Sequence, residues 1–339
     1  MSHVLTGHDL ELDTIVGTAS RFITTEYASL TAAGAPITWP VTPYRGEHGT
    51  TLDVSTGLTY PLKAERARRE RRVALSFTFP AGSGLDPAPV IAVQGLATVR
   101  DRDLVATSSR YFAESKARFP ELYDSMPEFV MRRMAWYWTR MWVEVTPIRV
   151  LWWEGGDLTR APRQWLAPLG TDAPASDPPP SGRGAGSWNP AQTDWRDRSD
   201  GVIERLGLPV LTVVDDSGFP IPLKTRAARR TADGFAVVPP VGVEVRPGPA
   251  FLSFHTHADQ FDGQENVGLT GTAFVDDGPN GEPEVRVRVD RALADFGVPR
   301  SKVRSTVHMI RAGRRLKPRL QAEAARRGTT VPRFDDLVR

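Results

Sequence analysis

The sequence predicts a mainly β (α+β) protein of two tandem, half-closed β-barrels of about six strands each, with short flanking helices and a basic C-terminal helix. Three observations predict this fold class. Both halves contain short alternating or β-branched runs bounded by Gly, Pro and Asp turns, which is typical of small barrels. Strand motifs of the first half recur in the second half. A segment rich in Pro, Gly and Ser separates the two halves.

The recurrence concerns two strand motifs and their spacing. The run 72–77 (RVALSF) corresponds to 249–254 (PAFLSF), and 93–99 (VQGLATV) corresponds to 269–275 (LTGTAFV). The sequence separation between the Phe and the Gly of these motifs is 18 residues in the first half (Phe77 to Gly95) and 17 in the second (Phe254 to Gly271). This match favours a tandem duplication of one β-fold over two unrelated β domains of similar composition.

Hydrophobic periodicity and turn signals place the individual elements in order along the chain. The strands expected in the first half are 22–30, 37–44, 50–55, 73–79, 90–100 and 142–153. Those expected in the second half are 210–215, 221–226, 234–238, 250–255, 267–275 and 285–289. Helices are expected at 63–71, 107–119, 121–135, 291–296 and 300–327, the last interrupted by Pro318.

The segment 156–198 is predicted to link an N-terminal barrel at 1–155 to a C-terminal barrel with its basic helix at 199–339. Its stretch 172–187 (DAPASDPPPSGRGAGS) has no hydrophobic period and therefore cannot bury a core of its own. Because tryptophans punctuate the linker, we expect parts of it to lie ordered against a domain surface.

Composition excludes several classes of protein. The 339 residues include no cysteine, which rules out disulfides, thiolate zinc sites, iron–sulfur clusters and a cysteine nucleophile. The mean hydropathy is −0.32, and no run approaches the roughly 18 apolar residues of a membrane span. The N-terminus lacks the basic and then apolar regions of a secretory signal. We therefore expect a cytoplasmic protein with no membrane partner.

One succession of motifs in the first half carries the functional prediction. It runs through 37–44 (ITWPVTPY), 47–49 (EHG), 52–57 (LDVSTG) and 63–77 (KAERARRERRVALSF). This order resembles the flavin-binding split-barrel superfamily that includes pyridoxamine 5′-phosphate oxidase, and 142–153 resembles the last strand of that family. The second half is similar more loosely. The resemblance implies two split β-barrels and a cofactor where barrels meet: flavin mononucleotide (FMN), or alternatively the deazaflavin coenzyme or none.

The cofactor contacts expected from this resemblance lie in the first half. Hydroxyls at a strand end can donate to a phosphate, and basic residues three apart share one helix face. The N-terminal end of that helix adds partial positive charge. Tryptophans at 39, 136, 138 and 142 could line a flat ring, and the last three would share a face if they lay on one strand. The predicted cofactor-binding residues are Thr38, Trp39, Val41, Thr42, Ser55, Thr56, Lys63 and Arg66.

Several positions depart from the pattern of the oxidase. Thr38, Pro43 and Leu62 stand where it has basic residues, and Val90 stands where it has glutamine. These departures argue against pyridoxamine phosphate oxidation. The second half has a shorter connection before its Phe254 strand, with one Arg and no Lys. We therefore expect one barrel to hold a cofactor and the other to be structural.

Two further features fall outside this prediction. His255 and His257 would place two imidazoles on one face, but no third ligand follows at a fixed spacing, so we expect a polar loop or pocket edge and no metal. Between 299 and 328, ten Lys and Arg accompany a single acid. An apolar stripe on this helix favours docking to the protein or a dimer partner over nucleic acid. The stripe consists of Val303, Val307, Ile310, Leu316 and Leu320.

The sequence thus predicts an FMN- or deazaflavin-dependent oxidoreductase that acts on a small molecule. No side-chain acid or base is demanded, because the cofactor supplies the redox chemistry. The competing hypothesis is a non-catalytic cofactor- or ligand-binding protein that kept the fold. The missing cations at Thr38, Pro43 and Leu62 favour this alternative, whereas the hydroxyls of Ser55 and Thr56 with Lys63 and Arg66 favour the enzyme. The barrels could pair within one chain or in a homodimer.

Overall fold

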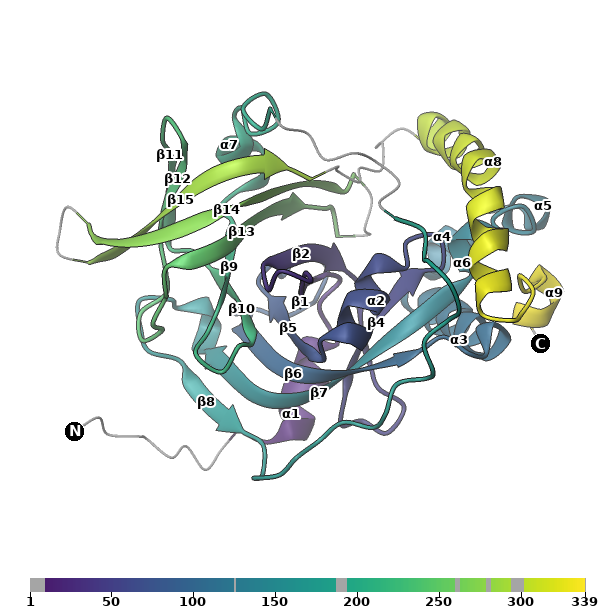
Figure 1. The fold of residues 1–339 in the computed structure, drawn as a ribbon, viewed down its shortest axis with the longest axis horizontal. Coiled ribbons are helices and arrows are strands. Elements are labelled where there is room, and N and C mark those ends of the chain that lie inside the picture. Colours follow the sequence, from purple (N-terminus) through teal and green to yellow (C-terminus); the bar gives the residue numbers. More distant parts are fainter. Residues whose placement is uncertain are drawn as a thin grey trace.

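The computed structural model describes residues 10–124, 126–186, 194–259, 263–278, 282–293 and 302–338. The chain forms two antiparallel sheets, of eight and seven strands, each curled around its own hydrophobic core (Figure 1). Most helices lie around the first sheet, and α7 (Val202–Leu206) packs on the second sheet. This mainly β architecture confirms the predicted fold class of two tandem split barrels.

The first barrel is formed by eight strands with one long antiparallel path. They are β1 (Thr25–Leu30), β2 (Pro36–Val41), β3 (Pro43–Arg45), β4 (Leu52–Gly57), β5 (Arg72–Phe77), β6 (Val90–Arg100), β7 (Arg140–Trp153) and β8 (Arg163–Leu166). Their order is β2-β1-β5-β6-β7-β4-β3, and β8 pairs with β7. Part of the expected linker is therefore a strand of the first barrel.

The second barrel repeats this order. Its strands are β9 (Val210–Val214), β10 (Pro220–Lys224), β11 (Ala227–Arg230), β12 (Gly234–Val238), β13 (Gly248–Thr256), β14 (Glu265–Asp277) and β15 (Pro283–Ala292). They are arranged β10-β9-β13-β14-β15-β12-β11, which is the path of the first barrel strand for strand. Each path has seven strands where about six were expected. In the first barrel the predicted strand 37–44 is divided into β2 and β3, and in the second barrel β11 was not predicted.

A β-bulge occurs at the same place in both barrels. The register shifts between Gln94 and Gly95 on β6, and between Thr270 and Gly271 on β14. A Cβ atom on Gly95 would lie 2.6 Å from a backbone carbonyl oxygen of β7, and one on Gly271 would lie 2.1 Å from a carbonyl oxygen of β15. Close backbone approach therefore requires glycine at both bulges. This shared feature supports the proposed duplication.

The helices differ more from expectation than the strands do. They are α1 (Leu12–Ala19), α2 (Leu62–Arg69), α3 (Leu104–Arg118), α4 (Pro120–Asp124), α5 (Glu128–Met131), α6 (Ala135–Trp138), α7 (Val202–Leu206), α8 (Lys302–Arg326) and α9 (Phe334–Leu337). The single helix expected at 121–135 was wrong, because prolines and a turn divide this region into three short helices. Among the described helices, none has the length and apolar character needed to cross a membrane.

The C-terminal helix α8 packs on the first barrel. Leu316, Leu320 and Ala324 are buried in the core of that barrel, which confirms the predicted docking for the first two. The helix runs through Pro318 without the predicted interruption, and this packing on both sides of the proline stabilises the continuous helix. The helix expected at 291–296 was wrong in its described part, because residues 291 and 292 end strand β15. Its residues 294–296, and the side chains at 303, 307 and 310, lie outside the described residues.

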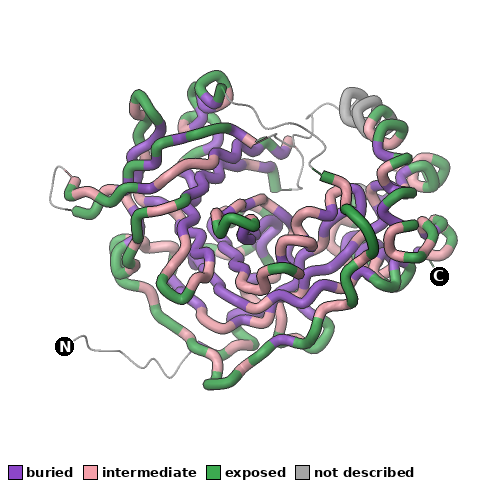
Figure 2. Tube along the Cα trace, viewed as in Figure 1, coloured by how far each residue is buried: buried purple, intermediate pink, exposed green. Residues whose placement is uncertain are grey.

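The two barrels pair with each other within the one chain. Strand β10 lies against β1, β5 and β6, and reciprocally β2 lies against β9, β13 and β14. Two side-chain hydrogen bonds cross the interface. One joins the hydroxyls of Thr38 and Thr212 (2.7 Å), and in the other Gln94 donates to Asp215 (2.7 Å). Figure 2 shows buried chain running through both sheets and the region between them.

Candidate functional site

Helix α2 brings Lys63 and Arg66 to the ends of β1 and β2. Ala64 and Ala67 of this helix are buried against the first core, so the two basic side chains occupy a neighbouring face. The Nε atom of Arg66 donates a hydrogen bond to the Ser29 hydroxyl at 3.0 Å. The ammonium group of Lys63 lies 5.7 Å from the centre of the Trp39 ring. The helix thus places both cations beside the second strand.

Arg140, at the start of β7, is a third cation at this place. It pairs with Gly57 at the end of β4, directly before the connection to α2. Its guanidinium lies over the rings of Tyr111 and Tyr137, at 4.3 and 4.6 Å from their centres, and donates to the Tyr111 hydroxyl at 3.2 Å. These aromatic contacts hold the side chain in one position. The sequence analysis missed Arg140, because only strand pairing brings it to α2.

Burial and neighbouring charge perturb the basic groups of this set. Burial, followed by the charges of Arg66 and Arg140, lowers the pKa of Lys63 to about 7. Burial is also the main cause that lowers the pKa of Arg66 to about 10. In the described part of the chain, none of the three forms an ion pair with a carboxylate. Uncompensated positive charge of this kind attracts an anion.

Most other basic residues of the same region form ion pairs, although Arg69 donates to the carbonyl oxygen of Leu30 at 3.0 Å. Arg68 pairs with Asp101 at 2.7 Å, and Arg72 pairs with Glu70 at 2.7 Å. Arg326 of α8 pairs with Glu65 of α2. The contrast identifies Lys63, Arg66 and Arg140 as a distinct set, which we call the cation cluster.

Hydroxyl groups lie at the end of β4 and on the turn that joins it to α2. Ser55 is half-buried, and Thr56 donates a hydrogen bond to the carbonyl oxygen of Tyr60 at 3.2 Å. The buried hydroxyl of Thr59 has no hydrogen-bond partner among the described residues. An unsatisfied buried hydroxyl next to cations is suited to an anionic oxygen. Thr59 was not predicted, because its position depends on the turn after β4.

The predicted residues of the second strand face two directions. Trp39 and Val41 share one face of β2, toward the first barrel, and Thr38 lies on the opposite face. Val41 is buried in the first core, and Thr38 is bonded to the second barrel. Thr42 is half-buried and follows the end of β2. Of these four residues, Trp39 is the one that the structure brings to Lys63.

The aromatic residues predicted to share a strand face do not do so. Trp136 and Trp138 lie on α6, whereas Trp142 lies on β7, so this expectation was wrong. Trp142 is covered by the guanidinium of Arg110, 3.9 Å from the ring centre. Helical geometry turns Trp136 and Trp138 to different clusters of the protein interior. The only one of these four tryptophans with a contact to the cation cluster in the described chain is Trp39.

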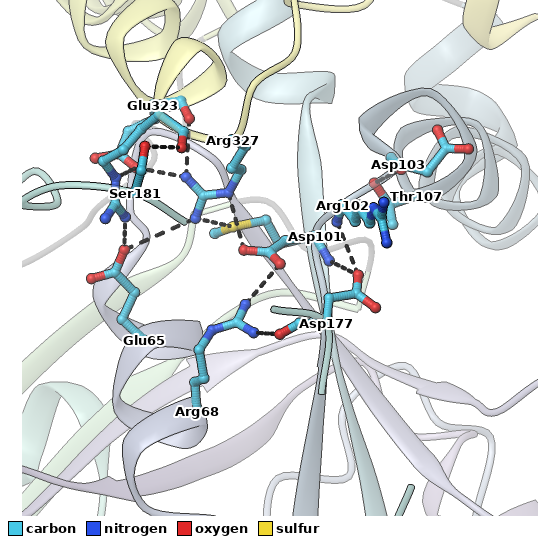
Figure 3. Close-up of polar contacts among 12 residues, drawn as sticks. Glu65, Arg68, Asp101, Arg102, Asp103, Thr107, Asp177, Ser181, Glu323 and Arg327 are labelled. Carbon is cyan, nitrogen blue, oxygen red and sulfur yellow. Dashed lines mark hydrogen bonds and ion pairs between the residues drawn. The ribbon is translucent and has the colours of Figure 1, made fainter. Parts of the chain in front are cut away.

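Helix α8 and the linker hold the region around α2. Arg319 donates a hydrogen bond to the carbonyl oxygen of Thr59 at 2.6 Å and a second one to Gly186 of the linker. Figure 3 shows the adjoining ion network, in which Arg327 reaches Asp101 at 3.0 Å. The linker residue Asp177 accepts hydrogen bonds from the backbone N–H groups of 101 and 102 and from Arg68. Two segments distant in sequence thus hold α2 in place.

The second barrel has no equivalent of α2. The residues between β12 and β13 form no helix and contribute one basic side chain, Arg246, which pairs with Asp216. Across the described residues, no group of three or more His, Asp or Glu side chains is arranged to hold a metal ion. The cation cluster therefore belongs to the first barrel alone.

Comparisons with known proteins give structural similarity only. No protein-family model and no curated protein matches the chain. A putative pyridoxamine 5′-phosphate oxidase from Listeria innocua has 15% sequence identity and a TM-score of 0.30, covering 42% of this chain and 98% of that chain. An F420 reductase has 17% identity and a TM-score of 0.29, covering 40% and 93%. A pyridoxamine 5′-phosphate oxidase-related, FMN-binding protein from Nostoc punctiforme has 11% identity and a TM-score of 0.29, covering 44% and 86%.

Proposed function

We propose that this chain is a cytoplasmic oxidoreductase that binds FMN, with the deazaflavin coenzyme as the alternative, and acts on a small molecule. The cation cluster carries the proposal, because Lys63, Arg66 and Arg140 face no carboxylate in the described residues. A phosphate group fits such a set of donors, and the unsatisfied Thr59 hydroxyl fits one of its oxygens. The bound cofactor would supply the redox chemistry.

The chain's own residues would bind and orient that cofactor. Lys63 and Arg66 would neutralise the phosphate from one side and Arg140 from the strand side. Arg319 would keep the Thr59 turn in place through its carbonyl oxygen. Trp39, next to Lys63, offers a flat apolar surface for a ring.

The charge state of Lys63 links binding to pH. Its pKa of about 7 means that the free site loses positive charge as the pH rises through neutrality. A bound phosphate stabilises the ammonium form and raises this pKa, so binding takes up a proton. Affinity for the anion should therefore fall as the pH rises above about 7.

A non-catalytic binding protein is the second candidate. Two residues that were expected to lie near the cofactor contact other residues instead, and this observation favours the binding protein. Thr38 is hydrogen-bonded to Thr212, and Trp142 is covered by Arg110. Such a protein would use the same cation cluster but would not expose a bound ring to a substrate.

A titration followed by absorbance and flavin fluorescence tests the proposal. Wild type should bind FMN or the deazaflavin coenzyme, and Lys63→Ala should weaken binding about 10- to 100-fold through the loss of a charged hydrogen bond. Lys116→Ala is the matched control, because Lys116 is exposed on α3. Absence of binding by wild type would contradict the cofactor site. Tight binding without reduction of the cofactor by any nicotinamide or small-molecule donor would favour the binding protein.

A further inference from the structure

A second group of polar side chains is buried between the two barrels. Thr24 and Glu26 come from the start of the first barrel, and His255 and His257 come from the end of β13 in the second. None of the four is more than 6% exposed. They take no part in the cation cluster. Buried polar groups at an internal interface need partners, and the hydrogen positions follow from those partners.

A continuous series of contacts links the four residues. The Nδ1 atom of His257 lies 2.8 Å from the carbonyl oxygen of Ala258, and its Nε2 atom lies 2.9 Å from the Thr24 hydroxyl. The same hydroxyl lies 3.3 Å from Nε2 of His255. On its other side, Nδ1 of His255 lies 3.3 Å from Oε1 of Glu26.

The carbonyl group of Ala258 determines which atom donates in each hydrogen bond of the series. A carbonyl oxygen only accepts, so Nδ1 of a neutral His257 carries the proton and Nε2 accepts from the Thr24 hydroxyl. Since Thr24 has a single proton, its oxygen must accept from Nε2 of His255. The Nδ1 atom of a neutral His255 is then without a proton, and it faces a carboxyl oxygen at 3.3 Å. Two acceptors in this position need one proton between them.

The surrounding groups decide where that proton resides. Burial, and then the neighbouring His257 and Lys224, lowers the pKa of His255 to about 3, so the ring does not hold a second proton. Burial raises the pKa of Glu26 to about 7 against the opposing effects of the Thr78 hydrogen bond (2.7 Å) and the Lys224 charge. The carboxyl group is therefore the proton carrier.

Two further observations agree with a neutral carboxyl group. The second oxygen of Glu26, Oε2, is buried with no hydrogen-bond partner among the described residues, which would be costly for a carboxylate. Lys224 of β10 does not compensate a charge on Glu26 by direct contact in this structure, since its ammonium group donates to the carbonyl oxygen of Leu208 at 2.8 Å. Burial lowers the pKa of His257 against the opposing effects of the Ala258 carbonyl group and the charge of Asp259, which agrees with the neutral ring assumed above.

We propose that the interface between the barrels contains a proton-binding site, in which Glu26 is retained as a neutral carboxylic acid that donates to His255, and whose deprotonation weakens the attachment of the second barrel. Deprotonation would leave a buried carboxylate facing an imidazole lone pair. The two barrels would then be held more firmly in mildly acidic than in alkaline solution. The site is independent of the proposed cofactor.

The linkage has a definite sign. The pKa of Glu26 rises from its ordinary value of 4.5 to about 7 on folding, so its stabilising contribution is complete at low pH and is lost as the pH rises from 4.5 to about 7. The lowered pKa of His255 acts in the opposite sense over part of this range. The comparison of wild type with Glu26→Gln isolates the carboxyl contribution, because glutamine has nearly the same shape and does not titrate. An amide NH2 group in the position of Oε1 can donate to His255, although it no longer accepts from Thr78.

Infrared spectroscopy of the full chain detects the proton directly. Wild type at pH 6 should show the carbonyl stretch of a protonated carboxylic acid, which Glu26→Gln lacks and which fades as the pH rises toward 8. Glu121→Gln, at an exposed position on α4, is the control and should keep the band. Thr78→Val removes a hydrogen bond that favours the ionised form, so it should move the midpoint to higher pH. No such band in wild type at pH 6, or a midpoint that Thr78→Val lowers or leaves unchanged, would overturn the proposal.

Unfolding by urea and amide hydrogen exchange test the effect on the interface. Between pH 5 and 8 the folding equilibrium constant of wild type should fall relative to Glu26→Gln by on the order of a hundredfold. Protection factors at β1, β2, β10 and β13, which are corrected for the intrinsic rise of exchange with pH, should fall above neutral pH in wild type and stay constant in the variant. A ratio that does not change with pH would contradict the interface role. If Glu26→Gln does not fold, the infrared titration of Thr78→Val and the hydrogen exchange of wild type still test the proposal.

Discussion

The two barrels share one path of strands but differ in what joins the fourth strand to the fifth. In the first barrel this connection is α2, which carries Lys63 and Arg66; in the second, a helix-free segment carries Arg246 in an ion pair. The order of strands and the bulge at glycine are the same in both. This difference shows that the shared strands determine the fold, whereas the short connection between the fourth and fifth strands determines whether the described part of a barrel carries unpaired basic side chains there.

The barrels also differ in how their ions are placed. In the first barrel Asp101 and Arg327 are almost fully buried, and their network ties α2 to α8 (Figure 3). In the second barrel the pair of Arg286 and Asp276 is exposed on the outer face. Removing one member of a buried ion network leaves an uncompensated charge, whereas an exposed pair contributes little.

The largest expected effect sharpens this contrast. Asp101→Asn should lower the free energy of unfolding by about 3–5 kcal/mol, because Arg68 and Arg327 would lose their shared carboxylate. Asp276→Asn in the second barrel should change it by less than about 1 kcal/mol. Urea unfolding of both variants measures the difference. If both variants lost the same free energy of unfolding, the buried ion network would contribute no more to stability than the exposed ion pair, which would contradict this contrast.

The next prediction concerns what the barrels have in common. Gly95→Ala and Gly271→Ala should each destabilise by about 1–3 kcal/mol, since the added Cβ would meet a carbonyl oxygen at 2.6 and 2.1 Å. Gly17→Ala on α1, with nothing within 4 Å, should be neutral or slightly stabilising. Thermal and urea unfolding provide the comparison. A loss in only one barrel would show that the two bulges are not equivalent.

The barrels should also differ in the pH dependence of their stability. Lys63 has a pKa of about 7 in the folded chain against an ordinary value of 10.5, so the unfolded chain binds more protons between these limits. Stability should therefore rise with pH from about 7 to 10 in wild type relative to Lys63→Met. Arg246→Met in the second barrel should not alter the pH dependence. A parallel pH profile for wild type and Lys63→Met would refute a perturbed lysine.

Sequence reasoning succeeded where a pattern is local. Strand 90–100 and strand 234–238 were predicted with the bounds that the structure gives. The repeated glycines, taken as a sign of duplication, lie at the two bulges, which were not predicted. It failed where side chains meet through tertiary pairing. Arg140 joins Lys63 only because β7 pairs with β4, and Thr38 turns away because of the direction in which β2 faces the second barrel.

The helical region before β7 shows another limit. Trp136 and Trp138 fit the alternation of a strand, but the segment forms a short helix packed on α8. Likewise the pattern of α8 could not reveal that Arg319 reaches the turn at Thr59. In both cases contacts between distant segments decide the conformation, and a local period does not contain them.

The central claim is that the cation cluster of the first barrel binds a phosphate group. The most direct test compares the affinities of FMN and riboflavin, which differ by that phosphate, for wild type, Lys63→Ala and Arg246→Ala. We predict that wild type and Arg246→Ala prefer FMN by at least about tenfold, as expected for a charged hydrogen bond, and that Lys63→Ala loses most of this preference. Equal affinities of wild type for the two flavins, or a preference that only Arg246→Ala abolishes, would contradict the claim.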